Sequence, residues 1–433
     1  MRILLLGASG FIGSALAYAL VREGHAVTGL GRDLAFGSRI LPEIGWIEGD
    51  LRRMRRVRDW ARALEGVELV VNASGALQTG LRDDVGKVQE KAILALIEAA
   101  RPAGVRHMIQ ISAAGADDQG ASPFMATKAL ADAALARAPL CHTILRPGLV
   151  IGRNGFGGTE LLRAAAGMPL VHAEISETGT IQCVALSDLV ESVLRAVREP
   201  QACSGRFDLV EAEGRPLGAI IALHRSWLGF SPARIRLVLP AMALRPVSFF
   251  ADLLGWLGWR SPLRSNSMAA LIHGVKGDAA QAACLLGREP LTLPAALAAL
   301  GPAGKADRWH ARLALLFPVA LAALVLLWLA SGALGLLRPE AAARLLVDGG
   351  MEPRSALFAV IVGSLTDLAI AAGLLFRASL ASALRVSILV ALAYLVGSLA
   401  IRPDLWLDPL GPMVKVIPAI MLSLACLAMS GER

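Results

Sequence analysis

The sequence predicts two folds in one chain, a doubly wound parallel α/β sheet followed by an all-α bundle of four transmembrane helices. Short apolar runs alternate with amphipathic stretches over residues 1 to about 150, the pattern of parallel strands joined by crossover helices. From Leu313 to Leu337, 25 consecutive residues carry no charge, and about 20 apolar residues suffice for a helix to cross a membrane. The apolar fraction of 55% exceeds the ~45–50% of soluble proteins, and this C-terminal part accounts for the excess.

The apolar periodicity places the expected elements along the chain. Strands are expected at residues 2–6, 25–30, 46–50, 67–73, 107–112 and 141–146, and helices at 11–23, 51–64, 82–100 and 122–138. Residues 150 to about 300 are more mixed, with helices expected at 187–197, 216–229 and 248–259 and a strand at 205–210. Membrane spans are expected at about 313–337, 355–376, 379–401 and 410–430.

The first expected strand runs into a glycine-rich turn and a helix, in the stretch LLLGASGFIG. Gly7, Gly10 and Gly13 lie three residues apart, where a dinucleotide pyrophosphate meets a helix N-terminus. Gly7 permits the tight turn, Gly10 lets the backbone approach phosphate oxygens, and Gly13 lets the helix pack on the strand. The residues expected to bind the cofactor here are Gly7, Ser9, Gly10, Phe11, Ile12 and Gly13.

A secretory signal peptide is the rival interpretation of this apolar N-terminus, which carries Arg2 near its start. The spaced glycines and the second strand that follows without a cleavage-like break argue against it. We therefore expect the N-terminal part to stay in the cytosol.

Residues after the next strands bear on the choice of cofactor. The segment GLGRD places Gly31 where an acidic residue would bind the ribose of NAD, and Arg32 follows, which would pair with the 2′-phosphate of NADP. Because of Arg32, NADP(H) is favoured over NAD(H) as the cofactor. Asp33, an acidic residue next to Arg32, keeps NAD(H) possible. Asp50 is a candidate acceptor for the adenine amine. The other residues expected to line the adenosine side are Leu51, Ala73, Ser74 and Gly75.

Four motifs in order resemble the short-chain dehydrogenase/reductase superfamily, in its extended or atypical branch. They are GASGFIG (7–13), EGDL (48–51), VNASG (71–75) and RPGLVIG (146–152), the last of which contains Pro147, a further expected cofactor contact. The resemblance implies a Rossmann-type sheet, a bound NAD(P) and a substrate cleft formed by the chain after about residue 150.

The resemblance also implies a Tyr-x-x-x-Lys pair, in which tyrosine transfers a proton and lysine holds the ribose. The matching stretch is FMATK, so Lys128 is present but Phe124 occupies the tyrosine position. Ser112 matches the first serine after the fifth strand, which puts Ala114 at the family's catalytic Ser/Thr position, within a residue or two. The catalytic residues therefore stay unassigned, while Lys128 is expected to bind the cofactor.

The C-terminal part resembles the DoxX-like membrane family, on the run RPDLWLDPLGPMVKVIPAI (402–420) and the preceding linker RWHARL (308–313). This resemblance implies a link to quinone or thiol redox chemistry. We expect a reductase-like domain with its substrate part at 1–230, a helical connection at 231–308 and a four-span domain at 309–433.

Asp367 lies within an expected span, where a carboxyl group costs about 2.5–3.5 kcal/mol. Either a proton or quinone contact or a hydrogen-bonded packing role explains its presence there.

Charge and composition narrow the function classes further. The net charge is +8, and basic residues cluster at 51–62, either as a solvated helix face, which is favoured, or as a contact for anionic headgroups. No nucleic-acid motif is present, and five scattered cysteines predict no metal site. The aromatic residues of 248–259 fit either a domain core, which is favoured, or a membrane-surface helix.

Two functions from different classes follow from the sequence. The favoured one is an NADPH-dependent oxidoreductase, multi-pass in the inner cell membrane, with its nucleotide-binding domain in the cytoplasm and a lipid-soluble acceptor such as a quinone. The other is a catalytically silent NADP(H)-binding scaffold or redox sensor that acts on a protein partner at the membrane, which Phe124 favours. A conventional sugar epimerase or dehydratase is a weaker third possibility, because Phe124 has no proton to transfer.

Overall fold

The computed structural model describes residues 1–75, 84–116, 122–155, 158–176, 178–259, 263–265, 274–409 and 411–430. By its internal contacts the chain divides into two compact units. The first unit comprises Met1–Gly255 and Arg260–Arg312, and the second comprises Trp256–Trp259 and Leu313–Arg433.

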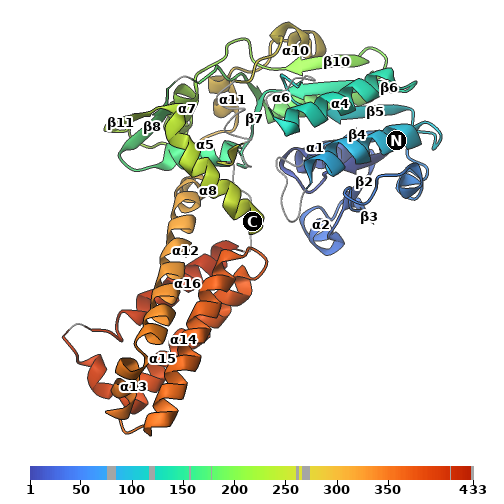
Figure 1. Ribbon diagram of the computed structural model, residues 1–433. Coiled ribbons are helices and arrows are strands. Elements are labelled where there is room, and N and C mark those ends of the chain that lie inside the picture. Colours follow the sequence, from blue (N-terminus) through green and yellow to red (C-terminus); the bar gives the residue numbers. More distant parts are fainter. Residues whose placement is uncertain are drawn as a thin grey trace. The chain divides into compact units, whose positions relative to one another are not determined.

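A seven-stranded sheet, all of whose described pairings are parallel, is the centre of the first unit (Figure 1). Its strand order is β10-β6-β5-β4-β1-β2-β3, so the order reverses direction at β1 and β4. The strands are β1 (Arg2–Leu6), β2 (Ala26–Gly31), β3 (Gly45–Glu48), β4 (Leu69–Asn72), β5 (His107–Ile111), β6 (Cys141–Pro147) and β10 (Gly205–Leu209). This is the predicted Rossmann-type sheet, and ligands of such sheets bind at the carboxyl ends of the strands near the reversal.

Helices cover both faces of this sheet. They are α1 (Phe11–Arg22), α2 (Leu34–Ile40), η1 (Val57–Trp60), η2 (Gly86–Lys91), α3 (Ala92–Ala100), α4 (Pro123–Arg137), α6 (Leu186–Arg198) and α10 (Ala279–Leu286). One core joins α1, α6 and α10 to the side chains of Ile3 and Leu5, and the other joins α3 and α4 to those of Leu4 and Leu6. Alternate residues of β1 thus point to opposite faces and are buried on both, as a central parallel strand requires.

The predicted helix at 51–64 is wrong. Residues 51–53 form a turn, residues 54–56 are irregular, and a short 3₁₀ helix, η1, follows. The carboxylate of Asp59 accepts hydrogen bonds from the backbone N–H groups of Arg55 and Arg56, at 3.0 and 2.9 Å, and Trp60 is fully buried. The arginines were expected on one helical face, but local hydrogen bonds and the Trp60 anchor hold this segment in an irregular path.

A smaller subdomain follows β6 in the chain. It contains two parallel strand pairs, β7 (Leu149–Ile151) with β9 (Cys183–Ala185) and β8 (Val171–Ile175) with β11 (Ile235–Leu239). Its helices are α5 (Gly158–Gly167), α7 (Leu217–Trp227), η3 (Ala241–Ala243), α8 (Leu244–Trp256) and α11 (Leu293–Ala299). The segment 231–308 was expected to be helical, yet it begins with the strand β11, whose apolar residues give no helical stripe.

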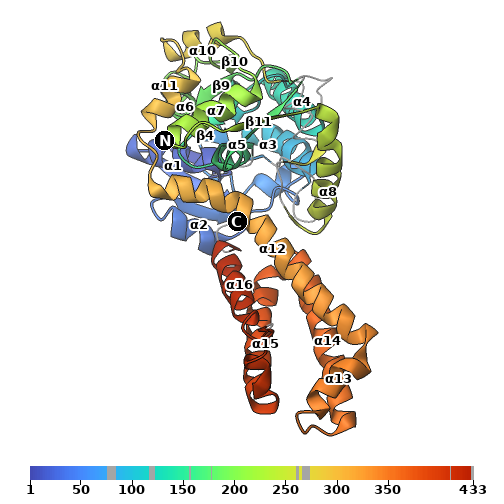
Figure 2. The same ribbon diagram turned by 90° about the vertical axis from the view of Figure 1, so that its left-hand side faces the viewer.

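Helices make up the second unit (Figure 2). They are α12 (Lys305–Leu337, which starts in the first unit), α13 (Pro339–Val347), α14 (Pro353–Leu375), α15 (Leu380–Ile401), η4 (Pro403–Trp406) and α16 (Val416–Ser430). Within the described residues, α12, α14 and α15 are long and apolar enough to cross a membrane, whereas α16 is apolar but has only 15 residues. Three of the four expected spans thus correspond to helices of sufficient length, and a fourth span stays a prediction.

Candidate nucleotide site

The turn between β1 and α1 is built as a cradle for an anion. Gly7 has φ +74°, a left-handed conformation that favours glycine, and its carbonyl accepts a hydrogen bond from Gly10 N at 2.9 Å. Gly10 is the N-cap of α1, and within the described structure no side chain caps this end. The first N–H groups of α1 therefore keep their hydrogen-bonding capacity for a ligand, and the helix dipole favours a negative one.

Each of the three glycines is required for a separate reason. A Cβ on Gly7 would lie 2.7 Å from the carbonyl oxygen of Ala73, so Gly7 lets the loops after β1 and β4 approach each other. A Cβ on Gly13 would lie 2.0 Å from the Gly7 oxygen. On Gly10 a Cβ would meet only that same oxygen, at 3.1 Å, and would otherwise fill the space above the loop. A ligand's phosphate would use that space, so these residues fit a dinucleotide.

The flanking predicted residues lie around this turn. Ser9 is exposed, and Ile12 packs against the core. Phe11 lies against the RPGLVIG motif, because a Cβ on Gly152 would be 2.8 Å from its ring. Pro147 accepts a hydrogen bond from Ala114 N at 2.9 Å through its carbonyl, which joins the loops after β5 and β6. The structure thus brings motifs that are more than a hundred residues apart in sequence together at the carboxyl ends of the strands.

Asp50 on the predicted adenosine side is already engaged by a neighbour. Arg52 donates from Nε and Nη2 to its carboxylate, with a shortest distance of 2.6 Å. This hydrogen bond, helped by the charges of Arg52 and Arg32, lowers the pKa of Asp50. Asp50 is therefore an anion beside two guanidinium groups. The next residue, Leu51, packs against the core.

Asn72 shapes the opposite wall. Its Oδ1 accepts from the backbone N–H of Ser74 at 3.0 Å and from the Ser74 hydroxyl at 2.6 Å, while its Nδ2 donates to Gln110 at 2.8 Å. These bonds hold the Ala73–Gly75 turn in place. A Cβ on Gly75 would lie 4.0 Å from the Lys128 Nζ, so this turn adjoins Lys128.

Lys128 is buried at the centre of the site, with a side chain that is 5% exposed. Its Nζ donates to the carbonyl of Ile111 at 2.6 Å and approaches that of Ser74 at 3.5 Å. Burial lowers the pKa of Lys128 to about 8, against the opposing effect of the Asp132 carboxylate. A surface lysine is therefore excluded, and the amine lies among the loops where a bound ribose is expected.

Phe124 begins the helix that carries Lys128. Ser122 caps α4 and Pro123 is its first residue, which fixes the start of the helix. The Phe124 ring is half-buried and offers no proton. The two tyrosines of the chain lie elsewhere: Tyr18 is 61% exposed on α1, and the hydroxyl of Tyr394 donates to Asp367 in the second unit.

Ser112 forms a hydrogen bond with Asp132, a residue that the sequence analysis did not single out. Its hydroxyl donates to Asp132 Oδ2 at 2.6 Å, and Arg146 Nε donates to the same oxygen at 3.1 Å. Asp132 is 3% exposed, and burial raises the pKa of its carboxyl. Asp132 lies one helical turn after Lys128, a spacing that could have pointed to it. Ser112 therefore helps to hold α4 on β5 and β6.

Gln89 and Thr127 are two further residues that sequence reasoning missed. The Thr127 hydroxyl donates to Gln89 Oε1 at 2.9 Å, and both side chains are buried. Gln89 Nε2 would lie 3.4 Å from a Cβ on Gly75. The pair thus links α4 to η2 at the edge of the same site.

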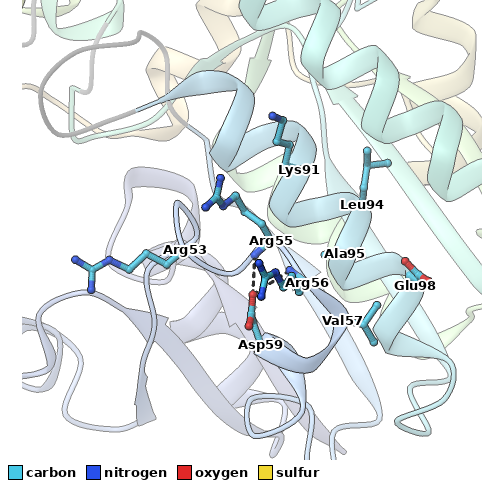
Figure 3. Close-up of a pocket in the computed structure, with 9 residues that line it drawn as sticks. All are labelled: Arg53, Arg55, Arg56, Val57, Asp59, Lys91, Leu94, Ala95 and Glu98. Carbon is cyan, nitrogen blue, oxygen red and sulfur yellow. Dashed lines mark hydrogen bonds between the residues drawn. The ribbon is translucent and has the colours of Figure 1, made fainter.

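A basic hollow of about 590 Å³ lies between the turn after β3 and α3 (Figure 3). Its lining residues are Arg53, Arg55, Arg56, Val57, Asp59, Lys91, Leu94, Ala95 and Glu98. Four cations and two anions give it a positive balance, and the guanidinium of Arg53 extends away from the others (Figure 3). Because Arg53 follows Asp50 by three residues, this hollow adds positive potential near the adenosine side.

The second unit has its own polar cluster, centred on Asp367 of α14. Ser331 of α12 donates to one carboxylate oxygen at 2.6 Å, and Tyr394 of α15 donates to the other at 2.8 Å. Asp367 is 3% exposed, so both oxygens of a buried carboxyl are paired. The cluster joins the three longest helices of the unit, which satisfies the expected need for partners.

Comparison with family models identifies the class of protein. Residues 7–179 match an NAD(P)H-binding family, and residues 323–424 match the DoxX-like family. The chain therefore belongs to the NAD(P)-binding Rossmann proteins related to short-chain dehydrogenases/reductases, and it carries a C-terminal DoxX-like membrane domain. Both predicted resemblances are confirmed.

Individual relatives are distant. An uncharacterised chloroplastic protein of Arabidopsis thaliana is 27% identical over 178 residues, which span 39% of this chain and 57% of the relative. A ceramide reductase of Caulobacter vibrioides is 24% identical over 249 residues, 55% of this chain and 74% of the relative. The Bordetella bronchiseptica enzyme WbmG in complex with NAD superposes with a TM-score of 0.51 at 20% identity, over 69% of this chain and 93% of WbmG, which shows the shared fold.

Proposed function

We propose that this protein is a membrane-anchored NAD(P)H-dependent oxidoreductase that passes reducing equivalents to a lipid-soluble acceptor such as a quinone. The observation that carries the proposal is the glycine cradle at Gly7–Gly13 with Lys128 buried beside it, on the same chain as apolar helices of membrane length. The Caulobacter relative is named as a reductase of ceramide, which supports a substrate of low polarity.

In this proposal each residue has a binding or positioning role. The N–H groups at the start of α1 hold the pyrophosphate, and Lys128 donates to the ribose hydroxyls. Ala73, Ser74, Gly75, Asp50 and Leu51 line the adenosine side, and Pro147 lies on the nicotinamide side. The reduced nicotinamide supplies a hydride, and since Phe124 has no acidic proton, the proton for the acceptor comes from water or from the acceptor's surroundings.

We further propose that the cofactor is NADP(H). Arg32 lies close enough to Asp50 to lower its pKa, and the basic hollow adds further positive potential. An additional phosphate is stabilised by such an environment. The membrane domain is proposed to be inserted in the inner membrane with four spans, α16 being the fourth, and with the nucleotide site on the cytoplasmic side.

Arg32→Glu is expected to weaken NADPH binding by at least tenfold and to change NADH binding by less than about threefold, because one charge-assisted contact is worth roughly 1.5–3 kcal/mol. The measurement is a fluorescence titration of both dinucleotides on the full protein in detergent. Arg39→Glu, an exposed arginine on the neighbouring α2, is the matched control for the change in net charge. Equal losses for NADPH and NADH would contradict the assignment to NADP.

The activity test uses purified full-length protein with NADPH and a panel of quinones. We expect oxidation of NADPH at 340 nm with at least one quinone, and a rate at least tenfold lower in Lys128→Met. Phe124→Tyr is expected to leave quinone reduction unchanged within about threefold, because hydride transfer depends on position more than on a tyrosine. Absence of turnover over the whole panel would contradict the proposal.

The second candidate is a catalytically silent NADP(H)-binding scaffold or sensor. Two observations favour it: Phe124 replaces the proton donor, and the Ser112 hydroxyl is committed to Asp132. Tight NADPH binding without oxidation of NADPH by any acceptor would select this function over the first.

A further inference from the structure

Helix α8 presents its large apolar side chains outward. Its buried positions are Ser248, Ala251 and Gly255, which are small and spaced as one helical face. The outward side chains are Val247 (43% exposed), Phe249 (66%), Phe250 (62%), Leu253 (52%), Leu254 (41%) and Trp256 (69%). A helix that packs on a domain core normally buries such residues, so the expectation that this stripe is core is wrong for Phe249, Phe250 and Trp256. Trp259, the last aromatic residue of the stripe, packs against the core of the second unit.

The exposed apolar surface continues along the chain before α8. In β11, Ile235, Leu237 and Val238 are 54%, 45% and 55% exposed, and Met242 in the turn between β11 and α8 is 67% exposed. We call β11, Met242 and the outward side chains of α8 the α8 surface. Isolated exposed apolar residues need no explanation, but a run of this length marks an interaction site.

The residues that follow α8 indicate which environment covers this surface. Trp256 ends the helix, and the following residues belong to the second unit. There, Trp259 Nε1 donates to the carbonyl of Leu375 at 2.6 Å, and Arg377 N donates to the carbonyl of Leu257 at 3.0 Å. Leu375 is the last residue of α14, one of the helices of membrane-spanning length. The end of α8 is therefore tied within three residues to the end of a membrane helix.

Residue types at this junction are those of a membrane–water interface. The Arg377 guanidinium lies 5.9 Å from the centre of the Trp259 ring, and tryptophan and arginine are enriched at that level of a bilayer. Exposed basic residues, Arg234 and Arg245, flank the apolar side chains of the α8 surface. An apolar face bordered by arginine is typical of helices that lie in the plane of an anionic membrane surface.

We propose that the α8 surface docks into the headgroup–acyl boundary of an anionic lipid bilayer. The nucleotide-binding unit is then held to the membrane by a lipid contact of its own, besides its covalent links to the second unit on either side of Trp256–Trp259 and at Arg312–Leu313. This proposal concerns binding to lipid and does not depend on whether the protein oxidises NADPH.

The test places a nitroxide label at position 249 or 253 of the full-length protein in nanodiscs that contain one-third phosphatidylglycerol. Cys284→Ala removes the exposed cysteine, and a label at Tyr18, which is 61% exposed on α1, is the matched control. Accessibility to oxygen and to nickel–EDDA is measured by power saturation. We expect the oxygen-to-nickel ratio at 249 and 253 to exceed that at 18 by at least fivefold.

Two results would overturn the proposal. Ratios at 249 and 253 equal to that at 18 would place the surface in water. Protection from both reagents would mean that a protein, such as a second copy of this chain, covers it. Because the labelled positions point away from the buried face of α8, the fold is expected to survive, and dichroism melting of each labelled protein verifies this. Phe250, which is 62% exposed, provides a third position for the label on α8.

Discussion

Gly13→Ala is expected to reduce dinucleotide affinity by at least tenfold. The added Cβ would lie 2.0 Å from the Gly7 oxygen, 2.7 Å from the Gly7 carbonyl carbon and 2.9 Å from the Ala8 Cα. All three atoms are backbone, so no side-chain rotation relieves the clash, and the turn or α1 must move. Overpacking of this kind costs about 1–3 kcal/mol, and here the displaced groups are those that face the phosphates.

A fluorescence titration of NADPH and NADH on the full protein measures the loss, for which Gly45→Ala is the matched control. Gly45 lies in β3 of the same sheet, and the nearest atom to its added Cβ would be Thr28 Oγ1 at 3.5 Å, an ordinary contact. Dichroism melting of both variants separates displacement of the loop from unfolding of the domain. Retention of wild-type affinity within threefold by Gly13→Ala would show that this loop does not hold the dinucleotide.

The sheet was predictable because each central strand is buried on both faces. The buried strand β1 and the glycines that follow it each have a local signature, since strand, turn and helix are adjacent in the chain. The prediction of a helix at 51–64 was wrong because the local pattern there does not match the local structure. Its spaced arginines mimic an amphipathic helix, but Asp59 caps the two N–H groups before η1 and interrupts any longer helix.

Residues of the candidate site could be predicted from the sequence only where they belong to a recognisable motif. Lys128 follows from its place in FMATK, but its burial and its bond to Ile111 depend on how α4 packs against β5. The Ser112–Asp132–Arg146 contacts join residues 14 and 20 positions apart in sequence, and no local pattern encodes them. For α8 the sequence gives an apolar stripe but not the direction in which it faces. Long-range packing decides each of these features.

Lys128→Met is expected to lower dinucleotide affinity about ten- to a hundredfold, because hydrogen bonds to a charged group contribute roughly 1.5–3 kcal/mol. Burial lowers the pKa of Lys128 to about 8, which also gives the wild-type protein a pH dependence. Below pH 8 the amine is a cation that attracts the anionic dinucleotide, and above pH 8 this attraction is lost. Wild-type affinity is therefore expected to fall about tenfold between pH 7 and pH 9.5.

The stability of the ligand-free protein is expected to change in the opposite direction. Between pH 8 and about 10.5 the unfolded chain holds a proton on Lys128 that the folded chain has released, so the free energy of unfolding rises with pH, by up to ~3 kcal/mol. Titrations and thermal melts at pH 7, 8, 9 and 10 measure both effects. Lys128→Met should lack both, while Lys305→Met, which removes an exposed lysine, should keep them.

A purely structural Lys128 would give a different result. In that case Lys128→Met would change the melting curve but leave dinucleotide affinity, and its dependence on pH, as in the wild-type protein. The opposite signs of the two effects therefore separate cofactor binding from packing, since a single loss of folded protein cannot weaken binding while stability rises. Lys128→Arg sharpens the distinction, because it keeps the charge at every pH tested and should retain binding at pH 9.5 better than the wild-type protein does.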